Sequence, residues 1–430
     1  MTTATVAPFP PTGRFELTKL LIQGRLRLVL LVCLVAPAVF VVAISNQGSL
    51  PTDTVFGRWM HSSGWAGPLV VLAFAGSWGL PLMVSLVAGD VFAVEDRLGT
   101  WRHLLVAVRS PRRIFAAKAL ASALVIVVLL ACLCLSSIVG GLIGVGAHPL
   151  VGLDGHVLTN GAALRTVLLA WASVLAPTLA FAAVGLLGSV VLGRSPMGLL
   201  VPALLALALN LVLLLPVPVA LRLALPSNGF VAWRGLFVDP ARTGPLLIST
   251  AVSLLWAVMA TGTAYLLFVR RDFTDLTNDG AGARTLGAAA LPLVATVALA
   301  ALVIGVATPA HGIERRPLER SLATAFGHLY VLQTAELHRP AVTEAQLHVR
   351  STCSEGTARQ WRCIVSWQLP GSTAVGNATY QLDVAAEGRY VADGDGPKEV
   401  NGSFQVRTTT GDAPNPLWQL DGYVDLLGHS

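Results

Sequence analysis

Charged side chains gather in one short segment between two long apolar stretches, at residues 90–113. Glu95, Asp96 and Arg102 place both signs of charge close together, where they could make ionic contacts to a partner. The apolar residues of the segment recur at the i, i+3, i+7 spacing of one helix face: Leu98, Trp101 and Leu105. The segment therefore predicts an amphipathic helix at the membrane surface, with Trp101 at the interface. The simplest interpretation is an interfacial loop helix beside a cluster of positive charges.

A second set of reactive side chains lies far along the chain. Cys353 and Cys363 are ten positions apart on two strand-like runs. In an oxidising compartment such a pair can close a disulfide. A zinc site is the alternative, but it needs two more ligands at close spacing. This region offers only scattered histidines, so the sequence favours the disulfide: His328, His338 and His348.

Motifs of catalysis are absent from the sequence. It contains neither a G-x-x-x-x-G-K-[ST] phosphate loop nor a G-x-S-x-G nucleophile motif. The centres of the apolar stretches hold almost no ionisable residue, whereas ion-coupled transporters and intramembrane hydrolases keep such groups in the membrane. Asp154-Gly155-His156 could hint at a metal, but two polar residues beside a glycine usually form a turn. If the chain transports a cargo, the energy must come from another protein.

The composition shows that membrane spans must position these residues. Of the 430 residues, 54% are hydrophobic and 12% are charged, about half the 25% that is usual in soluble domains. A soluble enzyme is therefore excluded as the whole protein. Residues 1–309 contain 10 of the 23 acidic residues and the rest of the chain contains 13. This division predicts a lipid-embedded body followed by a water-soluble domain.

Seven apolar runs have the roughly 20 residues that a helix needs to cross a bilayer. They lie at about 28–45, 67–89, 114–146, 163–192, 197–222, 245–269 and 286–308. Pro216 and Pro218 interrupt the fifth run near its end and predict a kinked or re-entrant segment. Gly140 and Gly144 have the small-xxx-small spacing that can form a helix–helix interface.

Lysine and arginine predict the orientation of these spans. The N-terminal segment is basic, the 90–113 loop carries five arginines and the 270–284 loop carries three. These segments should lie in the cytoplasm by the positive-inside rule, which also accounts for the net charge of +6 without any nucleic-acid partner. Seven spans from a cytoplasmic N-terminus then place the C-terminal part outside the cell membrane.

The C-terminal part predicts a small α+β domain. Residues 314–338 predict one helix, with its apolar residues on one face: Leu318, Leu322, Ala325 and Leu329. Four or five strand-like runs follow, at 343–352, 359–369, 377–392, 399–410 and 416–427. The expected domain is a helix packed on an antiparallel sheet.

The order of residues in the 89–118 segment has a parallel in a known family. Gly-Asp at 89–90, Glu95, Gly-Thr at 99–100, Pro-Arg-Arg at 111–113 and Lys118 follow one another. This order resembles the coupling helix of type-2 ATP-binding-cassette (ABC) exporter permeases. The run from Phe15 to Leu21 is similar to the interfacial connecting helix of that family, and residues 223–244 are similar to its short extracellular helices. The resemblance covers about residues 14–271; the seventh span and the soluble domain depart from the six-span plan.

The resemblance implies a permease subunit that moves an amphipathic or lipid-like cargo or drug outward by alternating access. It implies an ABC ATPase subunit that binds ATP and Mg, a second permease copy or paralogue, contact with membrane lipid, and no cofactor bound by this chain. Glu95, Asp96 and Arg102 would contact the ATPase subunit. Gly99 and Thr100 would shape the turn, and Trp101 would anchor the helix to the membrane.

Two other functions remain open at the level of sequence. The spans could be a scaffold for an interaction or sensor domain, or the chain could be an envelope glycosyl or acyl transferase, which would need acidic or histidine residues at a membrane edge. The predicted fold is an α-helical polytopic membrane protein with a six-span permease core, a seventh span and a small α+β extracytoplasmic domain. The expected boundaries are an interfacial helix at 1–27, the core at 28–271, a cytoplasmic linker at 272–285, the seventh span at 286–308 and the extracytoplasmic domain at 309–430.

Overall fold

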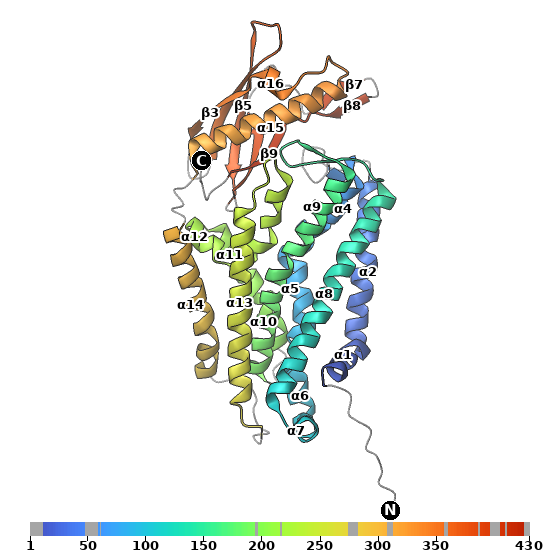
Figure 1. Cartoon of the computed structure of the whole chain (residues 1–430), viewed down its shortest axis with the longest axis vertical. Helices are drawn as coiled ribbons and strands as arrows, with labels where there is room; N and C mark the ends of the chain where they lie inside the picture. Colours follow the sequence, from blue (N-terminus) through green and yellow to red (C-terminus); the bar gives the residue numbers. More distant parts are fainter. Residues whose placement is uncertain are drawn as a thin grey trace, which may run out of the picture.

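The computed structural model shows a bundle of long helices with a small sheet domain at one end and the first helix, α1, at the other (Figure 1). It describes residues 12–47, 59–60, 62–193, 197–215, 217–273, 283–307, 313–356, 360–385, 388–395, 405–408 and 411–424. The bundle confirms the predicted polytopic α-helical membrane protein. The helix-and-sheet domain at its end confirms the predicted small α+β domain.

Among the residues that the structure describes, six helical segments are long and apolar enough to cross a membrane: Gly24–Ser45, Gly64–Leu98, Pro111–Gly144, Asn160–Val191, Gly244–Val269 and Thr285–Val306. Each corresponds to a predicted run. The predicted run at 197–222 corresponds to α11 (Met197–Leu214) and the short α12 (Val219–Leu223). The 18 residues of α11 extend about 27 Å, close to the roughly 30 Å of a hydrocarbon core. Pro216, one of the two predicted helix breakers, lies outside the described residues.

The remaining elements of the membrane domain connect or subdivide these segments. In chain order the described elements are α1 (Thr12–Ile22), α2 (Gly24–Ser45), η1 (Gly64–Ala66), α4 (Gly67–Phe74), η2 (Ala75–Gly79), α5 (Leu80–Ala88), α6 (Ala93–Leu98), α7 (Trp101–Val108), α8 (Pro111–Gly144), β1 (Leu150–Val151), β2 (Val157–Leu158), α9 (Asn160–Ser173), α10 (Leu175–Leu192), α11, α12, η3 (Pro226–Phe230), η4 (Ala232–Phe237), α13 (Gly244–Val269) and α14 (Ala283–Ala307).

Glycines allow α2 and α8 to pack closely. A Cβ atom at Gly140 would lie 2.6 Å from the Cα of Ala38, and one at Gly144 would lie 2.4 Å from the hydroxyl oxygen of Ser45. Neither distance leaves room for a side chain. The predicted small-residue spacing on α8 therefore does form a helix–helix interface, and its partner is the first span.

The C-terminal domain packs one helix on an antiparallel sheet. Its elements are α15 (Arg315–Glu336), α16 (Glu344–Leu347), β3 (Arg350–Glu355), β4 (Gln360–Gln368), β5 (Val375–Val384), β6 (Arg389–Gly394), β7 (Gln405–Thr408), β8 (Gly411–Pro414) and β9 (Gln419–Tyr423). The main sheet has the order β3-β4-β5-β6-β9, and β7 pairs with β8. Alternate residues of β4 and β5 face α15 and form a separate core with it, including Phe326, Val365 and Tyr380. The predicted apolar face of α15 is buried at all four positions.

Two strand predictions for this domain are wrong. The run at 343–352 begins with one helical turn, α16, because Thr343 and Gln346 form a capping box; the strand itself starts at Arg350. The run at 377–392 is two strands, β5 and β6, that reverse direction before Gly388, whose φ is 95°. A left-handed turn of this kind suits glycine and interrupts the alternation that a single strand would continue.

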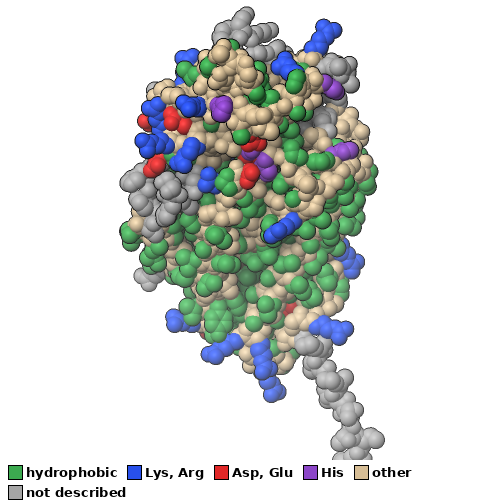
Figure 2. All heavy atoms as spheres, turned by 45° about the horizontal axis from the view of Figure 1, so that its top comes forward, with side chains coloured by type: hydrophobic (Ala, Val, Ile, Leu, Met, Phe, Trp, Pro, Cys, Tyr) green, Lys and Arg blue, Asp and Glu red, His purple; other side chains and the backbone are tan. Residues whose placement is uncertain are grey.

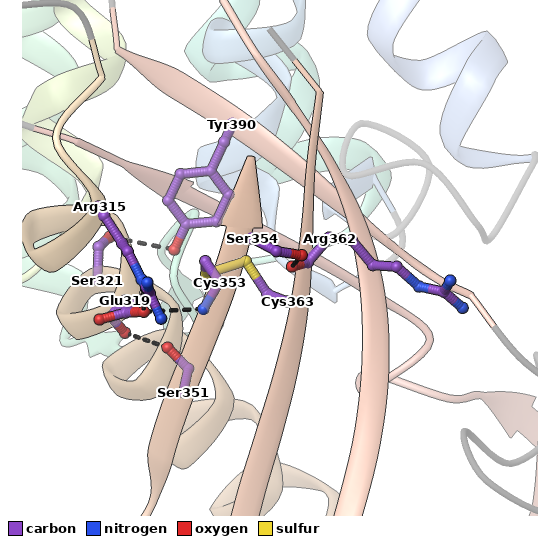
Figure 3. The surroundings of a disulfide bond; sticks show 9 residues. All are labelled: Arg315, Glu319, Ser321, Ser351, Cys353, Ser354, Arg362, Cys363 and Tyr390. Atoms are coloured by element: carbon purple, nitrogen blue, oxygen red, sulfur yellow. Dashed lines mark hydrogen bonds and ion pairs between the residues drawn. A yellow bond between two sulfur atoms is a disulfide. The ribbon is translucent and has the colours of Figure 1, made fainter. Parts of the chain in front are cut away.

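Cys353 and Cys363 form a disulfide between the paired strands β3 and β4 (Figure 3), as the sequence predicted. Both cysteines are buried. Glu319 of α15 accepts a hydrogen bond from the backbone N–H of Cys353 at 2.8 Å. The hydroxyl of Ser351 donates to the Glu319 carbonyl at 2.6 Å. The disulfide joins β3 to β4, and the two hydrogen bonds hold this edge of the sheet against α15.

Candidate functional site

The segment after α5 folds as two short helices with a glycine between them. α6 ends at Gly99, whose φ of 66° lies in the left-handed region, and α7 begins at Trp101. This turn changes the direction of the chain between α6 and α7. The prediction of a single amphipathic helix for the segment is therefore wrong. Leu98 is 65% exposed whereas Trp101 is 6% exposed, and the two side chains do not share a face.

Glu95 is the centre of a buried charge network. Its side chain is fully buried. Its Oε1 atom forms ion pairs with the Nζ atom of Lys118, at 2.8 Å, and with the Nζ atom of Lys19. The hydroxyl of Thr100 donates to Oε2. Lys118 also reaches Oε2 of Glu16 at 3.0 Å. Two carboxylates thus face two ammonium groups, and the network joins α1, α6 and α8.

Asp90 makes a second link, between α6 and the first span. Its buried carboxylate lies 2.8 Å from Nη1 of Arg25 and 2.7 Å from Nη2 of Arg97. Arg25 belongs to the first turns of α2 and Arg97 to α6. The carboxylate therefore holds the two helices together at the end of the second span.

Asp96 makes a third link, to the far end of α13. Its carboxylate forms a bidentate pair with Arg271, with an Nη1–Oδ2 distance of 2.9 Å, and accepts a hydrogen bond from the indole N–H of Trp101 at 2.7 Å. The Trp101 ring packs among the aromatic rings of Phe92, Phe268 and Phe273. Trp101 therefore anchors α7 to the protein interior and not to the membrane surface, which corrects the role expected from its sequence.

These three carboxylates connect the short helices to α1, α2, α8 and the end of α13. Removing one partner of a buried ion pair leaves an uncompensated charge and typically costs about 3–5 kcal/mol. A force that displaces α6 and α7 must therefore either break these pairs or move the spans that carry them. We call α6 and α7, with the Gly99 turn between them, the tip. The ion pairs can transmit a displacement of the tip to several spans at once.

The surface of the tip differs from its interior. The side chains of Leu98 and Val106 are 65% and 72% exposed, and Arg102 and His103 lie beside them. Figure 2 shows further Lys and Arg side chains at this end of the molecule, opposite the C-terminal domain. A groove of about 520 Å³ separates α1 from α7, and it is lined by apolar and basic side chains that include Phe15, Lys19, Leu104 and Arg113. An exposed apolar tip with basic neighbours suits a protein partner.

The predicted site residues differ in how deeply they are buried. Gly99 and Arg102 lie at the surface. Thr100 is half-buried, and Glu95, Asp96 and Trp101 are buried, so in this conformation the last three position the tip and do not reach a partner. Contact between this tip and an ATPase subunit stays a prediction.

The partners of the three carboxylates are not evident from the sequence alone. Lys118 carried a signal, because it follows the start of a long apolar helix and a charge there requires a counter-charge. Which carboxylates would meet it was not readable, because Glu16 lies 102 positions away and Arg271 lies 175 positions from Asp96. Pairings at such separations depend on the packing of the whole bundle.

The fold and this site together define a multi-pass membrane protein whose spans are tied to a two-helix tip at one end. Residues 14–192 match the family model of the ABC-2 family transporter protein. The matched region contains α1, the tip and most of the charge network, and it supports an ABC-2 type permease, the transmembrane component of an ABC transporter. The comparison with curated proteins found no match.

Proposed function

We propose that this chain is the permease subunit of an ATP-driven exporter for an amphipathic or lipid-like cargo or drug. A separate ABC ATPase subunit, which binds ATP and Mg, supplies the energy. Two permease chains, identical or paralogous, enclose the pathway and alternate between inward and outward access. The N-terminus and the tip of α6 and α7 lie in the cytoplasm, and the C-terminal domain lies outside the membrane.

The observation that carries this proposal is the attachment of an exposed tip to four helices through buried ion pairs. Leu98, Gly99 and Arg102 present a surface to the ATPase subunit. Glu95 and Asp96 transmit its movement to the spans by way of Lys118 and Arg271. Exposed and buried residues of the tip therefore have different roles. The exposed residues bind the partner, and the buried residues convert its movement into a movement of helices.

The cargo class is supported by what lines the spans. The most polar described side chain in the middle of an apolar helix is the amide of Asn210, which donates to the Ala206 carbonyl at 2.8 Å. A lipid-like molecule needs no ionised group for its recognition in the membrane, whereas an ion needs several. Lipid chains also match the apolar outer faces of α2, α8 and α11.

The test separates binding from coupling. Leu98→Asp with Arg102→Ala should reduce co-purification of the ATPase subunit by about tenfold or more, because it places a charge on the apolar tip and removes a basic neighbour. Glu95→Gln should leave co-purification intact but reduce the stimulation of ATP hydrolysis by cargo in reconstituted vesicles.

Arg165→Ala is the matched control, because Arg165 is an exposed arginine on α9, outside the tip. It should change neither measurement. Normal ATPase binding and normal cargo-stimulated hydrolysis in the Leu98/Arg102 double variant would rule out the tip as the docking surface. Recovery of the wild-type chain without any ATPase would favour the scaffold or sensor function.

A further inference from the structure

The C-terminal domain touches the membrane domain at a turn between the third and fourth spans. Gly155, with a φ of 89°, forms the apex of the turn between β1 and β2. A Cβ atom there would lie 2.7 Å from the Cγ of Leu329 and 3.1 Å from the Cβ of His328, both on α15. No side chain larger than hydrogen fits, so the two domains are in close contact at this point.

Asp154 holds the turn in place. Its carboxylate is buried, pairs with Nδ1 of His156 and accepts the backbone N–H of Asp239 at 2.8 Å. The backbone N–H of Leu153 donates to the carbonyl of Phe237 at 2.7 Å. The turn is therefore bound to the segment after η4 before the C-terminal domain adds any contact.

His328 bridges the two domains. Its Nδ1 atom lies 3.2 Å from the carbonyl oxygen of Asp154 and 3.6 Å from the Oδ2 atom of the same residue. Its Nε2 atom lies 3.2 Å from Oε2 of Glu344 on α16. One imidazole, 9% exposed, thus lies between a carboxylate of the membrane domain and a carboxylate of its own domain.

We propose that Asp154, His328 and Glu344 form a pH-dependent latch that holds the C-terminal domain on the membrane domain. With both ring nitrogens protonated, Nδ1 of His328 donates to the carbonyl oxygen of Asp154 and Nε2 donates to Glu344, and the positive ring attracts both carboxylates. A neutral ring carries a proton on only one nitrogen, so it can donate only one of these two hydrogen bonds. The attraction between the positive ring and the two carboxylates is also lost. The latch is closed when His328 is charged and weakened when it is neutral.

The surroundings set the pH range of the latch. Burial lowers the pKa of His328, but the hydrogen bond and charge of Asp154 and the charge of Glu344 outweigh it and raise the pKa above its ordinary value. Burial acts in the opposite direction on Asp154 and raises its pKa. The hydrogen bonds from His156, His328 and Asp239 outweigh this effect and keep the pKa of Asp154 low. Three other titratable residues of the described chain lie at this cluster: His156 on the turn, Asp239 after η4, and Tyr390 on β6, whose pKa is raised by burial.

The direction of the pH dependence of docking follows from the raised pKa of His328 in the docked state. Docking is strongest below the ordinary histidine range and weakens as pH rises through the raised pKa of the docked state. Each unit of pKa difference between docked and free states changes the docking equilibrium by up to about tenfold. Because Glu344 is half exposed, solvent screens its share, and Asp154 provides most of the effect.

Hydrogen exchange of the full chain in detergent tests the latch. The amide of Gly152 donates to the carbonyl of His156 within the turn, and the amide of Leu153 donates to the carbonyl of Phe237. Both should exchange faster when the C-terminal domain no longer covers the turn. After correction for the chemical exchange rate, their protection should fall severalfold between about pH 5.5 and about pH 8.5, the range in which histidine titrates. His328→Gln should show weak protection at both pH values.

Two further variants keep the test decisive. Glu344→Gln removes one carboxylate at a half-exposed position and should move the transition to lower pH without loss of folding. His338→Asn is the control, because His338 is exposed on the same domain, outside the contact, and asparagine tolerates its φ of 52°. Equal protection at both pH values in the wild type, or an unchanged transition in both His328→Gln and Glu344→Gln, would overturn the proposal.

Discussion

Lys118 is the residue on which the buried carboxylates of α1 and α6 both depend. Its side chain is 2% exposed, and its ammonium group lies within 3.0 Å of Glu16 and of Glu95. Glu95 has a second cation, Lys19, whereas Glu16 forms its described ion pair with Lys118 alone. Loss of Lys118 would therefore leave Glu16 as a buried carboxylate without a counter-charge.

We expect Lys118→Met to destabilise the membrane domain by about 3–5 kcal/mol, because methionine keeps the volume of the side chain but leaves that charge unpaired. The double variant Glu16→Gln with Lys118→Met should regain part of the loss. Thermal unfolding in detergent, followed by tryptophan fluorescence, measures both, with Arg165→Ala as the control. Equal unfolding temperatures for Lys118→Met and the wild type would show that the network contributes no stability.

At the scale of elements, the Gly99 turn decides how the two short helices are arranged. A side chain at Gly99 would have no neighbour within 4 Å, so a substitution there acts through the backbone alone. The left-handed conformation costs an ordinary residue about 1–2 kcal/mol, whereas asparagine adopts it more readily. The two helices would otherwise tend to continue as one, and α7 would lose its position against α8.

We expect Gly99→Val to uncouple ATP hydrolysis from cargo while the chain still folds, and Gly99→Asn to keep most of the coupling. The measurements are cargo-stimulated ATPase activity of the reconstituted complex and its thermal unfolding. The comparison isolates the backbone, because both side chains point into open space. Equal coupling in the two variants would mean that the orientation of α7 is unimportant.

Most helices and strands could be predicted from the sequence. For the tip and its ion pairs, only the position along the chain could be predicted. Apolar length located the six long apolar helices and the shorter α11, and the face of α15 followed from its helical spacing. The tip was located by its charges, but the sequence did not show that Gly99 divides it into two helices or that Glu95 and Asp96 point inward. Those orientations depend on partners that lie 23, 76 and 175 positions away along the chain, which local periodicity does not reveal. The hairpin of β5 and β6 was missed because both strands alternate alike on either side of their turn.

At the scale of the whole molecule, the two ends of the bundle carry different functional features. The tip, with its charge network, lies at one end and the C-terminal domain at the other (Figure 1). The long α8 leads from the tip to the β1–β2 turn on which that domain rests. A movement of the tip can therefore reach the latch through a single helix of 34 residues, about 50 Å long.

The position of α11 decides whether these two ends face opposite sides of the membrane. If α11 crosses the bilayer, five crossings separate the tip from the C-terminal domain; if it does not, four separate them and the two ends share a side. Its 18 residues extend about 27 Å, enough for a thin or locally adapted bilayer. Because the structure puts the tip and the domain at opposite ends of the bundle, we expect the crossing.

Cysteine labelling in intact cells measures this directly. In a background in which the free cysteines Cys33, Cys132 and Cys134 are replaced by alanine, a membrane-impermeant maleimide should label Gln381→Cys, on the exposed face of β5, in intact cells. Arg102→Cys should be labelled only after permeabilisation. Cys353 and Cys363 should resist alkylation until a reductant is added, because an oxidising exterior maintains their disulfide. Labelling of both engineered cysteines from one side would place α11 within a single leaflet and would put the latch and the tip in the same compartment.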